Sequence, residues 1–191
     1  DMKDQLNRAF LVSGVIIILE LLFESTTCII NGRPEPWAVP VSAVLHICLF
    51  SVAPVLAYFW FLMIRHWVVS EDKTSRRKNL LLLIPAAVNL ILVLLSPGYG
   101  MVFYLDSDAV YHRGPSFIVF VLVVYFYFLC SVVLICLRRE KVVKEEFIPL
   151  LIVGILPMIG GILQSMFYGL LLMWSSAGFS LIVVYIFLQQ S

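Results

Sequence analysis

The chain has 191 residues, of which 62% are hydrophobic and 13% are charged, whereas an average soluble domain is about half apolar and about a quarter charged. Its formal net charge is +1, and no run of Lys and Arg is long enough to indicate nucleic-acid binding. This composition excludes an ordinary soluble domain and a nucleic-acid-binding module. It predicts an integral membrane protein whose main surroundings are membrane lipid.

Six apolar stretches are long enough to cross a hydrocarbon core about 30 Å thick, which takes about 20 helical residues. The backbone has no water to bond in lipid, so helices are the expected state of these stretches. In chain order, the predicted spans are residues 8–27, 40–64, 79–96, 116–137, 147–167 and 170–188. The last two form almost one apolar run, which a tight turn near Tyr168-Gly169 would fold back.

Four prolines lie within these spans or at their ends: Pro54, Pro85, Pro149 and Pro157. A proline inside a helix removes one backbone hydrogen bond and kinks the helix. These prolines have two possible interpretations. Membrane helices tolerate proline routinely, so the residues can be without function. Alternatively, the kinks let the helices splay around a cavity and so serve a function.

The distribution of positive charge fixes the expected orientation. With the N-terminus in the cytoplasm, eleven of the thirteen Lys and Arg residues are cytoplasmic, and only Arg33 and Arg113 are external. Short loops rich in Lys and Arg resist translocation. The predicted fold is therefore a single all-α domain (residues 1–191) with six transmembrane helices and both termini cytoplasmic. It would be a multi-pass membrane protein.

The outer connection between the third and fourth helices has its own pattern. Residues 101–105 and 110–113 are two short β-prone runs that flank the Asp/Ser turn at residues 106–109. Such a pattern is typical of a β-hairpin. We expect a short extracellular hairpin that lies over the outer mouth of the helix bundle as a lid.

Polar groups inside membrane spans cost about 2.5–3.5 kcal/mol each when they are ionisable and at mid-helix, and they often mark function. Here they gather towards the outer leaflet, with Glu20 and Glu24 four residues apart on one helix face. We therefore predict an outward-facing pocket that binds an unidentified small amphipathic or cationic ligand. The candidate ligand-binding residues are Glu20, Glu24, His46, Asn89, Tyr111, Arg113, Gln164 and Trp174.

A purely structural interpretation of the same residues stays open. Either glutamate could pair with Arg113 and His46 and so lock the first helix to the hairpin. The two amide side chains could serve as hydrogen bonds between helices, and the tryptophan as an interfacial anchor. Catalysis is not expected, because the chain lacks the motifs of metalloproteases, serine hydrolases and nucleotide-binding loops. No metal-ligand spacing or cofactor motif is present either.

Several segments resemble the N-terminal membrane sensor regions of bacterial, mainly Firmicute-type, diguanylate cyclases, some of which have counterparts ahead of histidine kinases. The segments are residues 54–60 (PVLAYFW), 85–89 (PAAVN), 103–106 (FYLD), 111–117 (YHRGPSF), 156–164 (LPMIGGILQ), 167–169 (FYG) and 185–190 (YIFLQQ). The resemblance covers nearly the whole chain. It implies an input module whose last helix continues into a C-terminal cytoplasmic output domain, a cyclase that makes cyclic di-GMP, and a possible homodimer. On this reading the attached domain is the enzyme, and this chain is not.

Two other classes compete with a sensor. A small transporter or channel subunit would explain the proline-broken helices and the intramembrane glutamates. It would also be expected to show an internal repeat and polar groups in the inner leaflet, and the sequence shows neither. A scaffold that only anchors and dimerises a partner would leave the pocket collapsed and without ligand.

Overall fold

The structure is a computed structural model that describes residues 2–68, 80–142, 144–166 and 171–190. The elements in chain order are α1 (Met2–Ile30), α2 (Ala38–Val68), α4 (Ile84–Tyr99), β1 (Phe103–Leu105), β2 (Tyr111–Arg113), α5 (Phe117–Leu137), the 3₁₀ helix η1 (Arg139–Lys141), α6 (Lys144–Met166) and α7 (Leu172–Gln190). The predicted start of the third span at Asn79, the last residue of the fifth span, the turn near Tyr168-Gly169 and the start of the last span at Leu170 lie outside the described residues.

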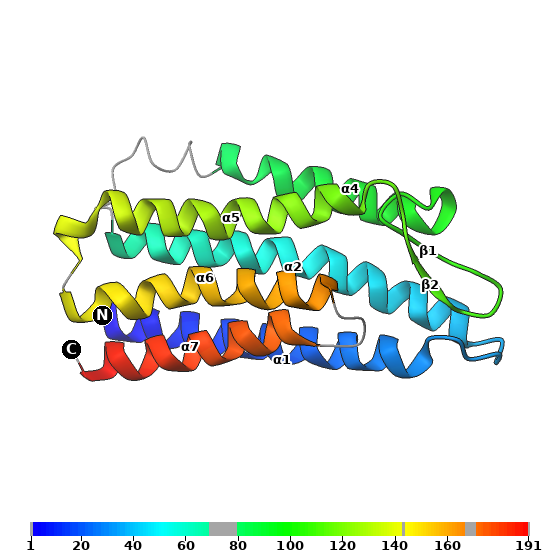
Figure 1. Cartoon of the computed structure of the whole chain (residues 1–191), viewed down its shortest axis with the longest axis horizontal. Helices are drawn as coiled ribbons and strands as arrows, with labels where there is room; N and C mark the ends of the chain where they lie inside the picture. Colours follow the sequence, from blue (N-terminus) through cyan, green and yellow to red (C-terminus); the bar gives the residue numbers. More distant parts are fainter. Residues whose placement is uncertain (1, 69–79, 143, 167–170, 191) are drawn as a thin grey trace.

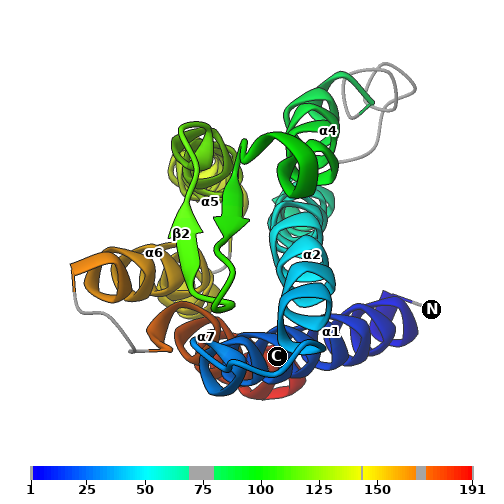
Figure 2. The same ribbon diagram turned by 90° about the vertical axis from the view of Figure 1, so that its right-hand side faces the viewer.

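Five helices form a closed ring, in which α1 packs on α2, α2 on α5, α5 on α6, α6 on α7, and α7 on α1. Helix α4 lies outside the ring, against α2 and α5. The beginning of α1 and the end of α7 lie at one end of the bundle, and the two strands lie at the opposite end (Figure 1). Viewed from that end, the strands extend across the bundle between α5 and α2 (Figure 2).

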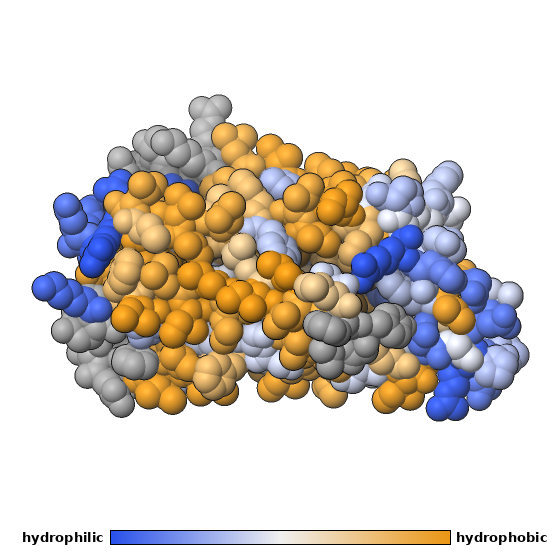
Figure 3. All heavy atoms as spheres, viewed as in Figure 1, coloured by the Kyte–Doolittle hydropathy of each residue, from blue (hydrophilic) through white to orange (hydrophobic). Residues whose placement is uncertain are grey.

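Within the described residues, five helices are long and apolar enough to cross a membrane. They are Asn7–Ile30, Ala38–His66, Leu80–Tyr99, Phe117–Leu137 and Glu146–Met166. Helix α7 contributes a shorter apolar segment, Leu172–Ile186, so the sixth crossing stays a prediction. Mostly apolar side chains cover the middle of the bundle, with hydrophilic ones at both ends (Figure 3). This surface is that of a multi-pass membrane protein.

Pro85 lies at a break in the third apolar span, Leu80–Tyr99. A turn at Leu83 separates it from the preceding helical residues, and Pro85 occupies the first turn of α4, where its missing N–H costs nothing. The Tyr127 hydroxyl of α5 fills the resulting gap. It donates to the carbonyl of Leu82 (2.7 Å) and accepts from the N–H of Ala86 (3.2 Å), the pair that an unbroken helix would join directly.

The predicted strands pair as an antiparallel hairpin, with Tyr104 opposite His112. Their rings stack at 4.9 Å. Asn31, in the connection between α1 and α2, accepts a hydrogen bond from the N–H of Tyr111 (2.8 Å) and so holds the hairpin over the bundle. Gly114 follows the second strand at a close approach to the backbone of Met101 and Gly100, where a Cβ would not fit.

Candidate functional site

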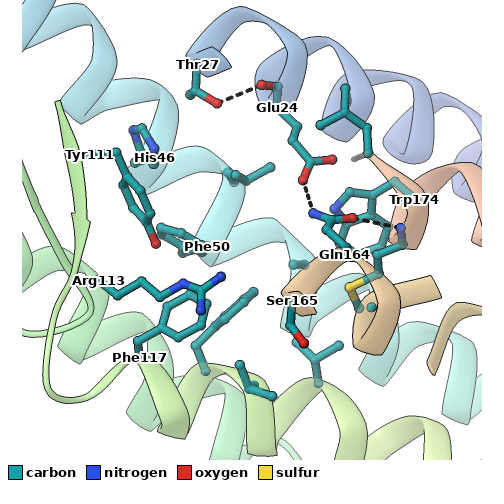
Figure 4. Close-up of a pocket in the computed structure, with 18 of the residues that line it drawn as sticks. Glu24, Thr27, His46, Phe50, Tyr111, Arg113, Phe117, Gln164, Ser165 and Trp174 are labelled. Atoms are coloured by element: carbon teal, nitrogen blue, oxygen red, sulfur yellow. Dashed lines mark hydrogen bonds between the residues drawn. The ribbon is translucent and has the colours of Figure 1, made fainter. Parts of the chain in front are cut away.

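A cavity of about 360 Å³ lies at the hairpin end of the bundle, walled by α1, α2, α5, α6, α7 and β2 (Figure 4). Small-molecule sites in proteins typically have volumes of about 300–1,000 Å³. Six of the eight predicted residues line it: Glu24, His46, Tyr111, Arg113, Gln164 and Trp174. The described helices therefore bring together residues that lie as far apart in the chain as the first and the last helix.

Gln164 connects three parts of the cavity wall. Its Nε2 donates a hydrogen bond to Oε1 of Glu24 on α1, and its Oε1 accepts from the backbone N–H groups of Leu172 and Met173, each at 2.9 Å. These two N–H groups belong to the first turn of α7, where a helix has no acceptors of its own. The amide of Gln164 thus caps α7 and holds Glu24 at the same time.

The second carboxyl oxygen of Glu24, Oε2, is buried and has no hydrogen-bond partner among the described residues. The residue is only 8% exposed, so water reaches its carboxyl poorly. A buried acceptor without a donor is costly, and in native structures such atoms call for an explanation. Glu24 is one of the residues that line the cavity, where a bound molecule can supply the donor.

The hairpin covers one side of the cavity with Tyr111 and Arg113. The Tyr111 ring stacks on His46 of α2 with centroids 4.7 Å apart and planes 4° apart, and the Nδ1–H of His46 donates to the carbonyl of Ser42 (2.8 Å). The guanidinium of Arg113 lies 4.9 Å from the centroid of the Phe117 ring, a cation–π contact. Arg113 is exposed and forms no ion pair with any residue that the structure describes.

The remaining lining is mainly apolar and aromatic. The ring centroid of Phe50 on α2 lies 4.8 Å from that of Phe120 on α5 and 5.9 Å from that of Phe117. Tyr125 and Trp174 complete the aromatic surface. The site therefore has polar groups on a few positions of an otherwise apolar cavity, which is the usual composition of a ligand pocket.

Residues 8–189 match a protein family described as the N-terminal 7TM region of histidine kinase. The chain belongs to this family. Neither the curated proteins nor the solved structures contain a significant match to it. Membership in this 7TM family supports the predicted membrane sensor region, and it implies a membrane setting and a cytoplasmic output domain as partner. Within the described residues, five helices are long and apolar enough to cross a membrane, and α7 contributes a shorter apolar segment.

Two predicted site residues of this 7TM region do not line the cavity. Glu20 lies one turn from Glu24 along α1, away from the hairpin; it is 0% exposed, and neither carboxyl oxygen has a partner in the described chain. Asn89 is also fully buried, and its Nδ2 donates to the carbonyl of Phe50 (2.8 Å). It does not line the cavity because its helix, α4, packs outside the ring. Neither glutamate forms an ion pair with Arg113 or His46.

Residues that the sequence did not single out complete the site. Phe117 receives the Arg113 guanidinium, and Tyr125 donates from its hydroxyl to the carbonyl of Met158 (2.9 Å), joining α5 to α6. The sequence holds no signal for the first, since Arg113 lies in β2 and its four-residue spacing to Phe117 does not place the two on one helix face. It holds none for Tyr125 either, one of many aromatics in its helix.

The turn of the hairpin contains a charged network outside the apolar spans. Oδ1 of Asp106 accepts from the N–H groups of Asp108 (3.0 Å) and Val110 (2.9 Å), and Oδ2 lies 3.1 Å from Nε2 of His112. The hydrogen bond from His112, followed by that from Val110, lowers the pKa of Asp106. The carboxylate thus ties the turn to the second strand. No group of three metal-binding side chains occurs in the part of the chain that was described.

Proposed function

We propose that this chain is a sensory input region that binds a small external or membrane-dissolved ligand in the cavity and passes a helix shift through α7 to a cytoplasmic output domain. The observation that carries the proposal is the position of Gln164. One amide lies in the cavity wall, holds a carboxyl of that wall, and caps the last helix of the chain.

A ligand that competes for Glu24 changes what Gln164 can bond. The amide of Gln164 then either keeps its hydrogen bonds to the first turn of α7 or turns towards the ligand and releases them. The two arrangements differ in the capping of α7, the helix that continues to the output domain in this proposal. Ligand binding shifts such an equilibrium only through unequal affinity for the two states. A 100-fold preference corresponds to about 2.7 kcal/mol.

The orientation follows from the charges. Eleven of the thirteen Lys and Arg residues fall in sequence segments that we assign to the cytoplasm. We place the end of the bundle that holds the beginning of α1 and the end of α7 on that side (Figure 1). The hairpin and the cavity then face the outside of a bacterial cell membrane, and α7 crosses as the sixth helix. This arrangement sends a signal from the cavity along α7 into the cytoplasm.

The output domain in this proposal is a diguanylate cyclase, on the strength of the sequence resemblance, and the active form is a homodimer. A histidine kinase is the second candidate, because the matching family is described as the input region of such kinases. The two are told apart in the full-length protein by the product: cyclic di-GMP in one case and a phosphorylated histidine in the other.

The test compares output activity of the full-length protein in membranes for the parent, Gln164→Leu and Ser165→Ala. Ser165 also lines the cavity, but its hydroxyl bonds only the carbonyl of Ile162 on its own helix. The proposal expects Gln164→Leu to change basal output and Ser165→Ala to leave it unchanged. Equal output from all three proteins contradicts the relay. Substrate-dependent flux or a proton leak in reconstituted vesicles would instead support a small transporter or channel subunit.

A further inference from the structure

We infer that the cavity accepts an amphipathic zwitterion: a primary ammonium group at Glu24, an anionic group at Arg113, and an apolar body between them. The inference rests on the proposed function only in treating the cavity as a ligand site. It adds the chemical class of the ligand.

The ammonium position follows from the free oxygen of Glu24. Gln164 occupies Oε1, whereas Oε2 is buried and has no donor among the described residues, and Glu24 is one of the residues that line the cavity. A carboxyl oxygen accepts hydrogen bonds and attracts positive charge, and an ammonium supplies three donors with a charge of the right sign. Figure 4 shows the Glu24 side chain extending from α1 at the edge of the site, with its carboxyl beside Gln164.

The anion position follows from Arg113. An Arg side chain keeps its charge and offers a planar set of donors that matches carboxylate or phosphate. The only partner of Arg113 in the described chain is the face of Phe117, so the guanidinium edge is available to an anion. It points into the site from the hairpin side, and Glu24 lies across the site from it (Figure 4).

Part of the cavity wall is aromatic. Phe50, Phe117 and Phe120 contact one another there, and aromatic faces favour stacked or edge-on rings of a ligand. A simple cation would bind at Glu24 alone, and a simple anion would bind at Arg113 alone. A molecule with both charges can bind at both walls.

Free amphipathic amino acids and the headgroup of phosphatidylethanolamine share this chemistry. The test uses the purified chain in nanodiscs of phosphatidylglycerol and measures binding of labelled L-phenylalanine, with competition by phenethylamine, 3-phenylpropionate and short-chain phosphatidylethanolamine. We expect each analogue that lacks one charge to compete at least about 10-fold more weakly than L-phenylalanine, the ratio that corresponds to about 1.4 kcal/mol. Stronger competition by the lipid than by L-phenylalanine assigns the zwitterion to the membrane.

Two variants locate the charges. Glu24→Gln keeps an acceptor for Gln164 and removes the charge, so it should abolish the advantage of L-phenylalanine over 3-phenylpropionate. Arg113→Gln should abolish the advantage over phenethylamine, and Arg113→Lys should restore part of it. The inference is overturned if neither L-phenylalanine nor the lipid binds, if the one-charge analogues compete equally well, or if both variants bind like the parent. An effect of Gln164→Leu on output would survive that result, so the two proposals fail separately.

Discussion

Replacement of Gln164 by Leu should loosen the first turn of α7 and destabilise the isolated chain. Leu has nearly the same size and fills the same space, but it offers no hydrogen bonds. The N–H groups of Leu172 and Met173 lose their shared acceptor, and loss of a helix cap costs about 0.5–2 kcal/mol. The buried carboxyl of Glu24 loses its donor, which costs about 1–3 kcal/mol. Together these give a loss of about 1.5–5 kcal/mol.

Two measurements on the purified chain in micelles check this value. Denaturation in mixed micelles gives the change in free energy of unfolding, and hydrogen exchange followed by mass spectrometry reports the opening of the first turn of α7. The capped amides should exchange at least about 10-fold faster in Gln164→Leu, since 1.4 kcal/mol is a factor of ten. Ser165→Ala is the matched control. If Gln164→Leu stays within about 0.5 kcal/mol of the parent, as an ordinary surface change does, the capping role is refuted.

Three further predictions concern other parts of the molecule. Tyr127→Phe should lower the free energy of unfolding by about 1–3 kcal/mol, because the broken turn before α4 loses the hydroxyl that serves Leu82 and Ala86; no change by denaturation would show that these groups bond elsewhere. Glu20→Leu should be neutral or stabilising and leave ligand binding intact, since it removes two buried oxygens without partners outside the cavity; a loss above about 1 kcal/mol in the same assay would assign Glu20 a partner. In the hairpin, the lowered pKa of Asp106 means that its carboxylate adds stability above its unfolded pKa of about 3.9, and that this contribution is lost as the pH falls below that value through the folded pKa. Asp106→Asn should remove this acid dependence of amide exchange in the two strands, whereas an identical pH profile in the variant would contradict the assignment.

The sequence predicts the cavity residues that break the apolar pattern. Glu24, His46 and Gln164 are costly in lipid, so each points to an internal partner, and the structure places all three at one cavity. The two strands are equally predictable from the sequence, because an Asp/Ser turn between two β-prone runs is typical of a β-hairpin.

The sequence does not predict where the cavity ends along a helix, which helix lies outside the ring, or how a break within a helix is compensated. Spacing of four places Glu20 and Glu24 on one face, but it does not say that the cavity ends between them. Asn89 has the same polarity as Gln164, yet its helix packs outside the ring, which depends on helix order and not on periodicity. Pro85 predicts an interruption of its span, but nothing in the sequence indicates that the Tyr127 hydroxyl, 42 positions away, bonds the two backbone groups at the break.

The central claim is that one bond, from Gln164 to Glu24, connects the cavity to the last helix. A double-mutant cycle of Glu24→Leu and Gln164→Leu in the full-length protein, with output activity as the readout, measures that connection directly. The account predicts that the double variant differs little from Gln164→Leu alone, with an interaction energy of at least about 0.5 kcal/mol. Fully additive effects of the two substitutions would contradict it.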